Sequence, residues 1–306
     1  MTKKAYSGSD GIPSGSAGEN VTEGCLVLEG GAFRGLYTQG VLDVLMMRGL
    51  NFRSVIGVSA GALAGANYLS GQIGRSARIN LGYRHDSRYI GQKALRNSGS
   101  ILDVGFLTED RGILEPFDRE RFDRPARNFT AVATCLENGE TVFFEKGSCT
   151  DIMLSIRASA TMPFISPPVA IDGLHYLDGG CSLAIPFRRA IDSGSEKIVV
   201  IRTRCRGFRT GGRRNRAALR FYRDHPAFAE KLAGSMTEYD RECDELDRLE
   251  SAGGVFVIYP SERVDVSRME GDLEKLGRLY RLGISDCEAL LPDLADYLEK
   301  NARLRG

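Results

Sequence analysis

Short apolar runs alternate with helix-like stretches along the first part of the chain. Residues 25–28 form a continuous apolar run, which predicts a buried parallel strand. Residues 36–48 repeat apolar positions with helical spacing, and Gly49 ends this predicted helix. A second apolar run at 55–56 leads into a stretch of small residues with helical character at 60–66. This order of strand, helix, strand and helix predicts a parallel, doubly wound sheet.

The next segments predict further strands and helices around the same sheet. Residues 131–136 and 141–144 predict a hairpin, because the Asn138-Gly139 pair suits the tight turns of hairpins. Asp151 predicts the N-cap of a helix that runs to residue 160. Strands or hairpins are expected at 169–177, 198–201 and 255–259, and helices from Pro186 to about 194, from 273 to 283 and from 285 to 300.

Three regions differ in composition. Residues 1–24 are rich in Gly, Ser and polar residues, which predicts a disordered tail. Residues 25–204 contain most of the predicted strands and are expected to form a catalytic core. Residues 205–306 are expected to form a helical C-terminal region with one further strand, packed on the core. Within the core, residues 71–125 predict loops and short helices over the face of the active site, and whether they form a lid is open.

Composition is that of an ordinary globular protein. Hydrophobic residues make up 42% of the 306 residues and the net charge is +1, so no overall field favours nucleic acid or a membrane. No apolar segment approaches the length that spans a bilayer, and residues 1–24 contain no apolar leader. Seven cysteines without a Cys-x-x-Cys pair predict reduced thiols and a cytoplasmic location. We expect neither a metal nor a cofactor.

Gly57-Val58-Ser59-Ala60-Gly61 is the main chemical motif. It lies between a predicted strand and a predicted helix, as in a nucleophile elbow, where the turn pushes the serine out of the sheet into a cleft. With 36 glycines in the chain, a match of this kind arises by chance about one time in three. The motif therefore needs support from other residues.

A nucleophilic serine needs a base and donors for the developing oxyanion. Gly30 and Gly31 follow the first strand and precede a helix, where free backbone N–H groups point outward. Asp178 follows a predicted strand and precedes two glycines, and a carboxylate in an apolar cleft can act as a base. Asp172 is a second, less well placed carboxylate. Three histidines exist, and all are poorly placed for a catalytic triad: His85, His175 and His225.

These residues resemble the patatin-like phospholipases, a family with a Ser-Asp dyad. Its glycine-rich loop is similar to Gly30-Gly31-Ala32-Phe33-Arg34-Gly35, although Ala32 replaces the third glycine. Its elbow is similar to residues 57–61, and its aspartate motif to Asp178-Gly179-Gly180. The segment before the aspartate strand, residues 158–168, also resembles the family. Residues 254–260 and 273–283 look similar to the C-terminal end of a bacterial subgroup.

The resemblance implies a three-layer α/β/α sandwich with a mostly parallel sheet. It also implies that Ser59 is acylated, that Asp178 is the base, and that N–H groups of Gly30, Gly31 and Ala32 hold the oxyanion. The supporting residues would be Arg34, Gly57, Gly61, Gly179 and Gly180. The predicted activity is that of a serine acylhydrolase on lipids, of the phospholipase A type. The alternatives are a soluble esterase or thioesterase for small acyl groups, and a catalytically silent protein that binds lipid or a partner.

The basic segment from Arg202 to Arg223 has two interpretations. It contains nine arginines and no acid, while residues 238–250 contain seven acids. The segment either contacts anionic lipid head groups at a membrane surface, or it is solvated and partly paired with those acids. Few aromatic residues are interleaved with the arginines, so nucleic acid is not an expected partner. A phosphate-binding role for residues 30–35 is disfavoured, because neither glycine-rich nucleotide motif is matched.

Overall fold

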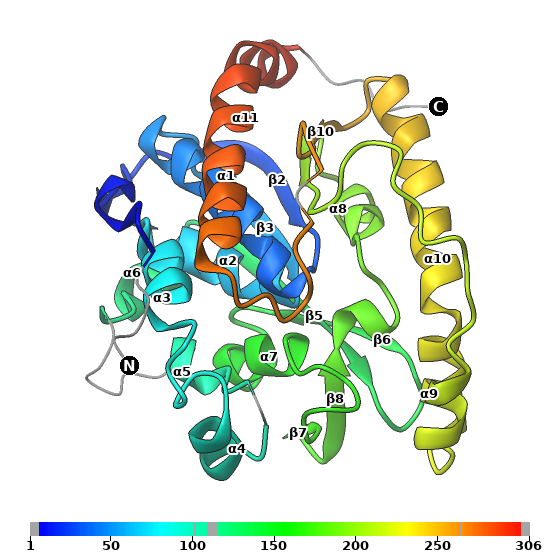
Figure 1. Cartoon of the computed structure of the whole chain (residues 1–306). Helices are drawn as coiled ribbons and strands as arrows, with labels where there is room; N and C mark the ends of the chain where they lie inside the picture. The colour runs from blue at the N-terminus through cyan, green and yellow to red at the C-terminus, as the bar shows by residue number, and fades with distance from the viewer. Residues whose placement is uncertain (1–5, 101, 109–114, 264, 301–306) are drawn as a thin grey trace.

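The computed structural model describes residues 6–100, 102–108, 115–263 and 265–300. Most of its strands form one eight-stranded sheet with the order β10-β9-β2-β3-β5-β8-β7, and β6 pairs with β5 (Figure 1). The strands from β10 to β5 are parallel, whereas β6 and β8 run antiparallel to β5. The sheet strands are β2 (Thr22–Leu28), β3 (Phe52–Val58), β5 (Asn128–Cys135), β6 (Thr141–Glu145), β7 (Val169–Ile171), β8 (Leu174–Asp178), β9 (Ile198–Ile201) and β10 (Phe256–Ile258).

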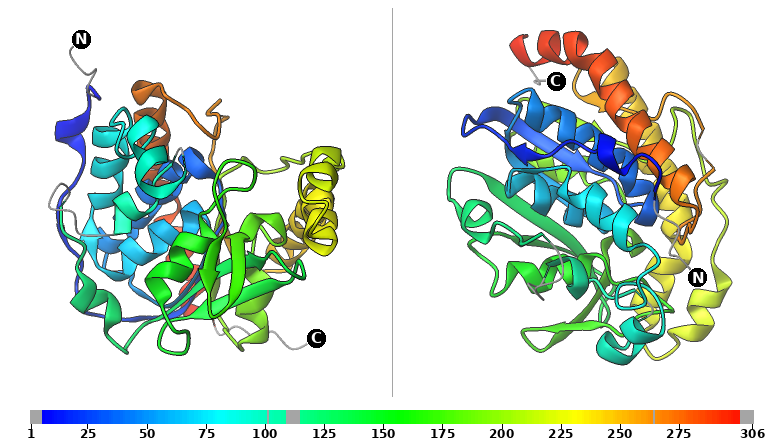
Figure 2. Two further views of the ribbon diagram at one scale, coloured as in Figure 1. Left: turned by 90° about the horizontal axis from the view of Figure 1, so that it is seen from below. Right: turned by 60° about the vertical axis from the view of Figure 1, so that its left-hand side comes forward.

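Helices cover both faces of this sheet. Leu26 and Leu28 of β2 pack in a core with one set of helices, while Cys25 and Val27 pack in a separate core on the other face. This alternation follows from the pleat of a strand, which points successive side chains to opposite faces. The predicted three-layer α/β/α sandwich is therefore confirmed. Helices α1 (Gly35–Met47), α2 (Ala60–Leu69), α7 (Ile152–Ser159) and α11 (Leu273–Glu299) lie on the first face, and α8 (Phe187–Asp192) and α10 (Pro226–Ser251) on the second (Figure 2).

Shorter elements fill in the edges of the molecule. Residues 71–125 contain loops and short helices, as predicted, and residues 109–114 of that segment lie outside the described part. Asp151 caps α7 by accepting hydrogen bonds from the backbone of Met153 and Leu154, as predicted. The remaining elements are η1 (Ser9–Gly11), β1 (Gly15–Ser16), η2 (Ala32–Arg34), β4 (Gln72–Ile73), α3 (Arg75–Tyr83), α4 (Gln92–Ser98), α5 (Gly105–Thr108), α6 (Arg119–Asp123), η3 (Gly179–Cys181) and α9 (Arg216–Phe221).

The N-terminal segment differs from the predicted disordered tail. Residues 6–24 carry a short helical turn, β1 and the beginning of β2, and β1 pairs with β4. Tyr6 is 4% exposed and Ala17 is 5% exposed, and both belong to the main core. The tyrosine ring fills a site beside Gly277 of α11, where a Cβ atom would lie 2.0 Å from the ring. The partner that orders this segment is thus remote in sequence, which composition cannot reveal.

The C-terminal region also differs in detail from the prediction. The two helices expected at 273–283 and 285–300 form a single helix, α11, with Pro292 inside it. Helix α10 is 26 residues long and was not predicted as an element, because its charged residues hide a narrow apolar stripe. Strand β10 pairs with β9, so the sheet continues into this region. Across the described residues, the helices are all too short or too polar to cross a membrane.

Candidate active site

Ser59 occupies a sharp turn between β3 and α2. Its backbone has φ 56° and ψ −121°, a region that residues other than glycine rarely adopt. Such strain costs about 1–3 kcal/mol and persists only where the surrounding structure enforces it. Gly57 and Gly61 flank the turn, and a Cβ atom on Gly61 would lie 2.5 Å from the carbonyl oxygen of Leu28. The local structure is that of the predicted elbow.

Strand β5 brings Ser59 and Asp178 together. Val132 pairs with Val58 of β3 on one side and with Phe143 of β6 on the other. The next residue, Ala133, pairs with Asp178 of β8 on the side opposite β6. Strands β3 and β8 therefore lie end to end along the same edge of β5, and their carboxyl ends meet. Gly179 permits this meeting, because a Cβ atom there would lie 2.3 Å from the carbonyl oxygen of Val132.

The two side chains form a direct hydrogen bond. Ser59 Oγ donates to Asp178 Oδ2 at 2.6 Å, and each residue is only 8% exposed. Burial raises the pKa of Asp178 from 3.8 to about 6, and hydrogen bonds from Ser59 and the Gly180 backbone partly oppose this shift. Its carboxylate is thus ionised at neutral pH, yet it is a stronger base than a solvated aspartate.

Other contacts fix the orientation of both residues. The second oxygen of Asp178 accepts a hydrogen bond from the backbone N–H of Gly180 at 2.8 Å. The backbone N–H of Ser59 donates to Oγ of Ser159, the last residue of α7, at 2.9 Å. Thr134 Oγ1 donates to the backbone carbonyl of Asp178 at 3.0 Å. Both reacting groups are therefore held from more than one side.

The glycine-rich loop lies directly beside Ser59. A Cβ atom on Gly30 would be 3.2 Å from Ser59 Cβ, so a larger residue there would press on the nucleophile. Gly31 contacts Thr203 in the same way, with 2.8 Å from its hypothetical Cβ to Thr203 Oγ1. Ala32 has φ 49°, a left-handed conformation in which glycine is normally favoured. The adjacency of the loop and the elbow follows from the parallel pairing of β2 with β3.

A buried ion pair anchors this loop from behind. Glu29, the residue before Gly30, accepts hydrogen bonds from Arg202 Nε at 3.0 Å and from the Tyr239 hydroxyl at 2.8 Å. Arg202 also donates to the Tyr239 hydroxyl and to Cys243 Sγ. Strand β9 and helix α10 therefore hold the loop through charged and polar contacts, of which the pair between Arg202 and Glu29 is buried.

Arg34 lies between the loop and α1. Its Nε is buried and has no hydrogen-bond partner among the described residues. Burial and the neighbouring charge of Arg204 lower the pKa of Arg34 to about 10, so it stays charged at neutral pH. The side chain is thus a cation with an unused donor near the predicted oxyanion loop.

A mostly apolar cleft of about 840 Å³, including its open mouth, adjoins Ser59. Helices α2 and α3, with Tyr89, Leu102 and Phe117, form one wall of this cleft, and Met153, Ala160 and Met162 form another. The segment before α11 closes it with Arg268 and Met269. Arg84 fixes that segment by donating hydrogen bonds to the carbonyl groups of Met269 and Glu270. Concave sites with a mostly apolar lining and a few polar groups are typical binding sites for small molecules and acyl chains.

None of the three histidines is among the described residues that line this cleft. His85 and His175 are exposed, and His175 Nδ1 lies 2.8 Å from Glu137. His225 occupies the N-cap position of α10, and its side chain makes no capping hydrogen bond there. Asp172, the alternative carboxylate, lies in the turn between β7 and β8, where it accepts a hydrogen bond from Thr150. Of these candidate bases, Asp178 alone contacts Ser59 Oγ within the described residues. In the described part of the chain, no group of acidic, histidine and cysteine side chains is arranged to bind a metal ion.

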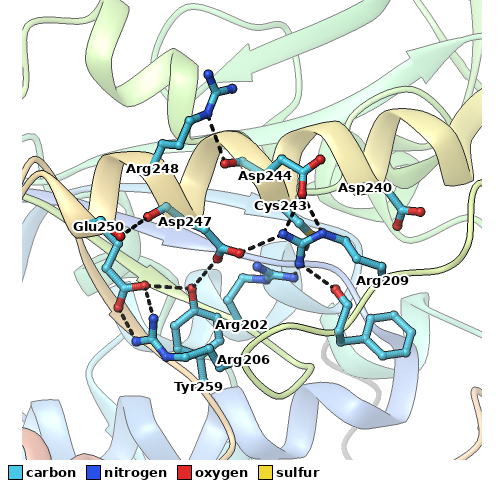
Figure 3. Close-up of polar contacts among 12 residues, drawn as sticks. Arg202, Arg206, Arg209, Asp240, Cys243, Asp244, Asp247, Arg248, Glu250 and Tyr259 are labelled. Atoms are coloured by element: carbon cyan, nitrogen blue, oxygen red, sulfur yellow. Dashed lines mark hydrogen bonds and ion pairs between the residues drawn. The ribbon is translucent and has the colours of Figure 1, made fainter.

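The basic segment divides into two parts. Arg202 is 1% exposed and cannot contact a membrane, which corrects the N-terminal limit of the proposed contact surface. Arg206 pairs with Glu250, and Arg209 pairs with Asp244 and Asp247, as Figure 3 shows. These arginines hold the segment against α10 through the acids that the sequence suggested. From Arg213 onward the arginines are exposed.

Several residues of the site were not predicted. Ser159 lies in a segment that resembles the family, but nothing in its sequence assigns it the contact with Ser59. Glu29 is an acid at the end of an apolar strand, which is a recognisable signal for a buried polar contact. Arg268 and Met269 carry no sequence signal, because they reach the cleft only through the path of the chain before α11.

The chain is similar to a known protein family. A family model described as patatin-like phospholipase matches residues 26–191, more than half of the chain. A second model, described as a domain of unknown function (DUF6363), matches residues 225–299, which span α10, β10 and α11. The three motifs of the site lie within the first match.

Individual relatives share roughly a quarter to a third of their residues with the matched part of this chain. The uncharacterized protein YjjU of Escherichia coli is 31% identical over 185 residues, covering 58% of this chain and 51% of that protein. The probable lipid hydrolase 463L of Invertebrate iridescent virus 6 is 24% identical over 188 residues, covering 56% and 64%. The chain thus spans about half the length of the first of these relatives. The crystal structure of VipD from Legionella pneumophila matches with a TM-score of 0.50 at 15% identity, covering 92% of this chain and 68% of VipD, and shows the same fold.

Proposed function

The chain belongs to the patatin-like phospholipase family, and from that premise we propose that it is a serine acylhydrolase that cleaves acyl esters of lipids. The observation that carries this proposal is the hydrogen bond from Ser59 Oγ to Asp178 Oδ2 at 2.6 Å, at the edge of an apolar cleft. A buried carboxylate with a raised pKa in contact with a serine hydroxyl is a nucleophile with its base.

Acylation begins with attack of Ser59 Oγ on the ester carbonyl carbon. Asp178 Oδ2 takes the hydroxyl proton as the bond forms, and the carbonyl oxygen becomes an oxyanion. Backbone N–H groups of Gly30, Gly31 and Ala32 stabilise that oxyanion, an effect worth about 3–4 kcal/mol for each donor in related chemistry. The tetrahedral intermediate collapses when Asp178 returns the proton to the leaving alkoxide. The products of this half-reaction are the free alcohol and an acyl ester of Ser59.

Deacylation repeats the sequence with water. Asp178 removes a proton from a water molecule, whose oxygen attacks the acyl carbonyl, and the oxyanion forms again in the same place. Collapse breaks the bond to Ser59 Oγ, which recovers the proton from Asp178. The fatty acid leaves and the dyad returns to its starting state. The fixed position of Ser59, with its N–H bound to Ser159, supports this role, because the nucleophile needs no reorientation.

The substrate class follows from the cleft. Its lining by residues such as Leu63, Ile79 and Met162 favours an alkyl chain over a polar acyl group. Arg34 and Arg268 add positive charge beside the reacting groups, which favours an anionic substituent such as a phosphate ester. We therefore prefer a phospholipid over the small acyl esters and thioesters of a soluble esterase. The free cysteines are compatible with a reducing, cytoplasmic setting.

Hydrolysis of a short fluorogenic ester and of a long-chain phospholipid tests the proposal. The wild-type protein should cleave both, with the higher kcat/KM for the phospholipid, and the Ser59→Ala variant should cleave neither. A preference for the short ester would assign the chain to the small-acyl esterases. Wild-type protein that is folded and inactive on both would instead support the catalytically silent alternative.

A further inference from the structure

Exposed apolar side chains are grouped on the loop that follows α7 and on α9 (Arg216–Phe221). Phe164 is 37% exposed, Ile165 is 37% exposed and Phe221 of α9 is 61% exposed. The rings of Phe164 and Phe221 are in contact, with centroids 5.2 Å apart, although the residues are remote in sequence. Large apolar side chains grouped on a surface mark sites of contact with a membrane or another macromolecule.

The backbone holds this group in an exposed position. Phe164 has φ 71°, an unfavourable conformation for a phenylalanine. Its backbone N–H donates to the Tyr222 hydroxyl at 2.9 Å, and the Tyr222 ring packs on the buried Phe228 of α10. The loop that carries Phe164 is thus fixed to the end of α9 and to α10. These contacts hold the ring in its exposed position.

Exposed arginines lie on the same chain segment as Phe221. Arg213, Arg216 and Arg220 are exposed and form no ion pair within the described residues, while Arg223 lies near Asp224 only at 3.9 Å and Arg214 pairs with Glu230. Of the earlier arginines in the same segment, Arg206 and Arg209 pair with acids of α10. The positive charge that remains is therefore concentrated on and beside α9, next to Phe221.

The loop that carries Phe164 begins in the wall of the cleft. Ala160 and Met162 line the cleft, and Phe164 follows two residues later in the same loop. Figure 1 shows α9 at the same end of the molecule as α7 and the β7–β8 hairpin. A surface that contacts Phe164 would thus meet the opening through which an acyl chain reaches Ser59.

We propose that Phe164, Ile165 and Phe221, together with Arg213, Arg216 and Arg220, form a docking surface for an anionic lipid bilayer. The arginines approach the acidic head groups, and the aromatic side chains insert between them. Contact there aligns the cleft mouth with the membrane, so that a lipid can enter the cleft without crossing water. This inference rests on the proposed function for the reason to dock, but docking itself does not require hydrolysis.

Co-sedimentation with vesicles tests the docking surface separately from catalysis. The protein is used as the Ser59→Ala variant, so that no lipid is consumed, with vesicles of phosphatidylcholine alone or mixed with phosphatidylglycerol. It should bind the mixed vesicles more tightly, and the affinity should fall as salt is raised. Substitution of both Arg216 and Arg220 by Gln should weaken that binding about 25-fold, because each arginine contributes about fivefold. Phe221→Ser should also weaken binding.

A matched control removes the same charge elsewhere. Arg48 and Arg278 are exposed on α1 and α11 and form no ion pair in the described part of the chain. Their double Gln variant should bind vesicles as tightly as the parent protein, and circular dichroism should show all variants folded. Equal weakening by the two double variants, or no preference for anionic vesicles, would overturn the proposal. Binding of a single-stranded oligonucleotide that needs Arg216 and Arg220, without binding to vesicles, would assign the surface to nucleic acid instead.

Discussion

Arg202 Nε lies 3.0 Å from Glu29 Oε2, and both side chains are 2% exposed. This pair joins the end of β9 to the residue that precedes Gly30, so it couples the C-terminal layer to the loop beside Ser59. An ion pair excluded from water is costly to break, because the remaining charge is left without a partner.

Removal of Arg202 should therefore destabilise the fold. We expect Arg202→Met to lower the free energy of unfolding by about 3–5 kcal/mol, measured by urea denaturation. Arg206→Met is the control, since the Arg206 side chain is 63% exposed in its pair with Glu250 and should lose less than about 1 kcal/mol. Similar losses in both variants would show that the buried pair has no special role.

Tyr239 should affect catalysis through the same contact. Tyr239→Phe removes the hydroxyl that donates to Glu29, which loosens the loop beside Ser59. We expect kcat for a short ester to fall about tenfold with little change in KM, because the loop acts on the oxyanion and not on the bound ester. Tyr259→Phe, which loses contacts with Asp247 and Glu250 on α10, is the matched control. An unchanged kcat in Tyr239→Phe would show that the hydrogen bond from Tyr239 to Glu29 does not affect catalysis.

The raised pKa of Asp178 predicts opposite effects on activity and stability. Because the base must be ionised, kcat/KM should fall with a slope of one proton below pH about 6. The folded state binds this proton more tightly than the unfolded state does, so ionisation of Asp178 destabilises the fold above pH 6. That cost disappears as the pH falls through about 6 towards 3.8.

Asp178→Asn should therefore abolish turnover and still stabilise the protein. The difference between the pKa of Asp178 in the fold, about 6, and its ordinary value of 3.8 corresponds to about 3 kcal/mol at pH 8. The increase in the free energy of unfolding over wild type should shrink towards pH 4. Urea denaturation at the two pH values measures it. A variant that is less stable than wild type at pH 8 would show that the carboxylate is stabilised in its site.

Much of the site could be predicted because its signals are local. The apolar runs of β2 and β3 and the glycines after them specify two parallel strands with adjacent carboxyl ends, which places Gly30 beside Ser59. The contact between Ser59 and Asp178 is different. It depends on the register of β5 with β3 and with β8, so the sequence motifs alone indicated a pair without giving its distance.

The remaining features depend on partners that are distant in sequence. Tyr6 is ordered because α11 offers it a site at Gly277, while the polar composition around it predicted disorder. Arg202 was grouped with the exposed arginines that follow it, but the end of a central strand buries it against Glu29. Helix α10 was hidden by its acids, of which Asp244, Asp247 and Glu250 face the arginines of the preceding segment.

Close packing of α11 on α1 should be sensitive to a single methyl group. A Cβ atom on Gly40 would lie 2.2 Å from the carbonyl oxygen of Tyr280, so Gly40→Ala should lower the free energy of unfolding by at least about 1–3 kcal/mol. Gly82→Ala is the control in α3, where no atom lies within 4 Å, and should be neutral or stabilising by about 0.5–1 kcal/mol. Urea denaturation compares the two. Equal free energies of unfolding for Gly40→Ala and Gly82→Ala would show that α1 and α11 can move apart at little cost.

The central claim is that Ser59 is a nucleophile activated by Asp178. Reaction with a fluorophosphonate probe, followed by mass spectrometry of the labelled peptide, tests it most directly. The account predicts phosphonylation of Ser59 in the wild-type protein, much slower labelling in Asp178→Asn, and unchanged labelling when His85, His175 or His225 is replaced. Labelling of another serine, equal labelling of Asp178→Asn, or loss of labelling in one folded histidine variant would contradict it.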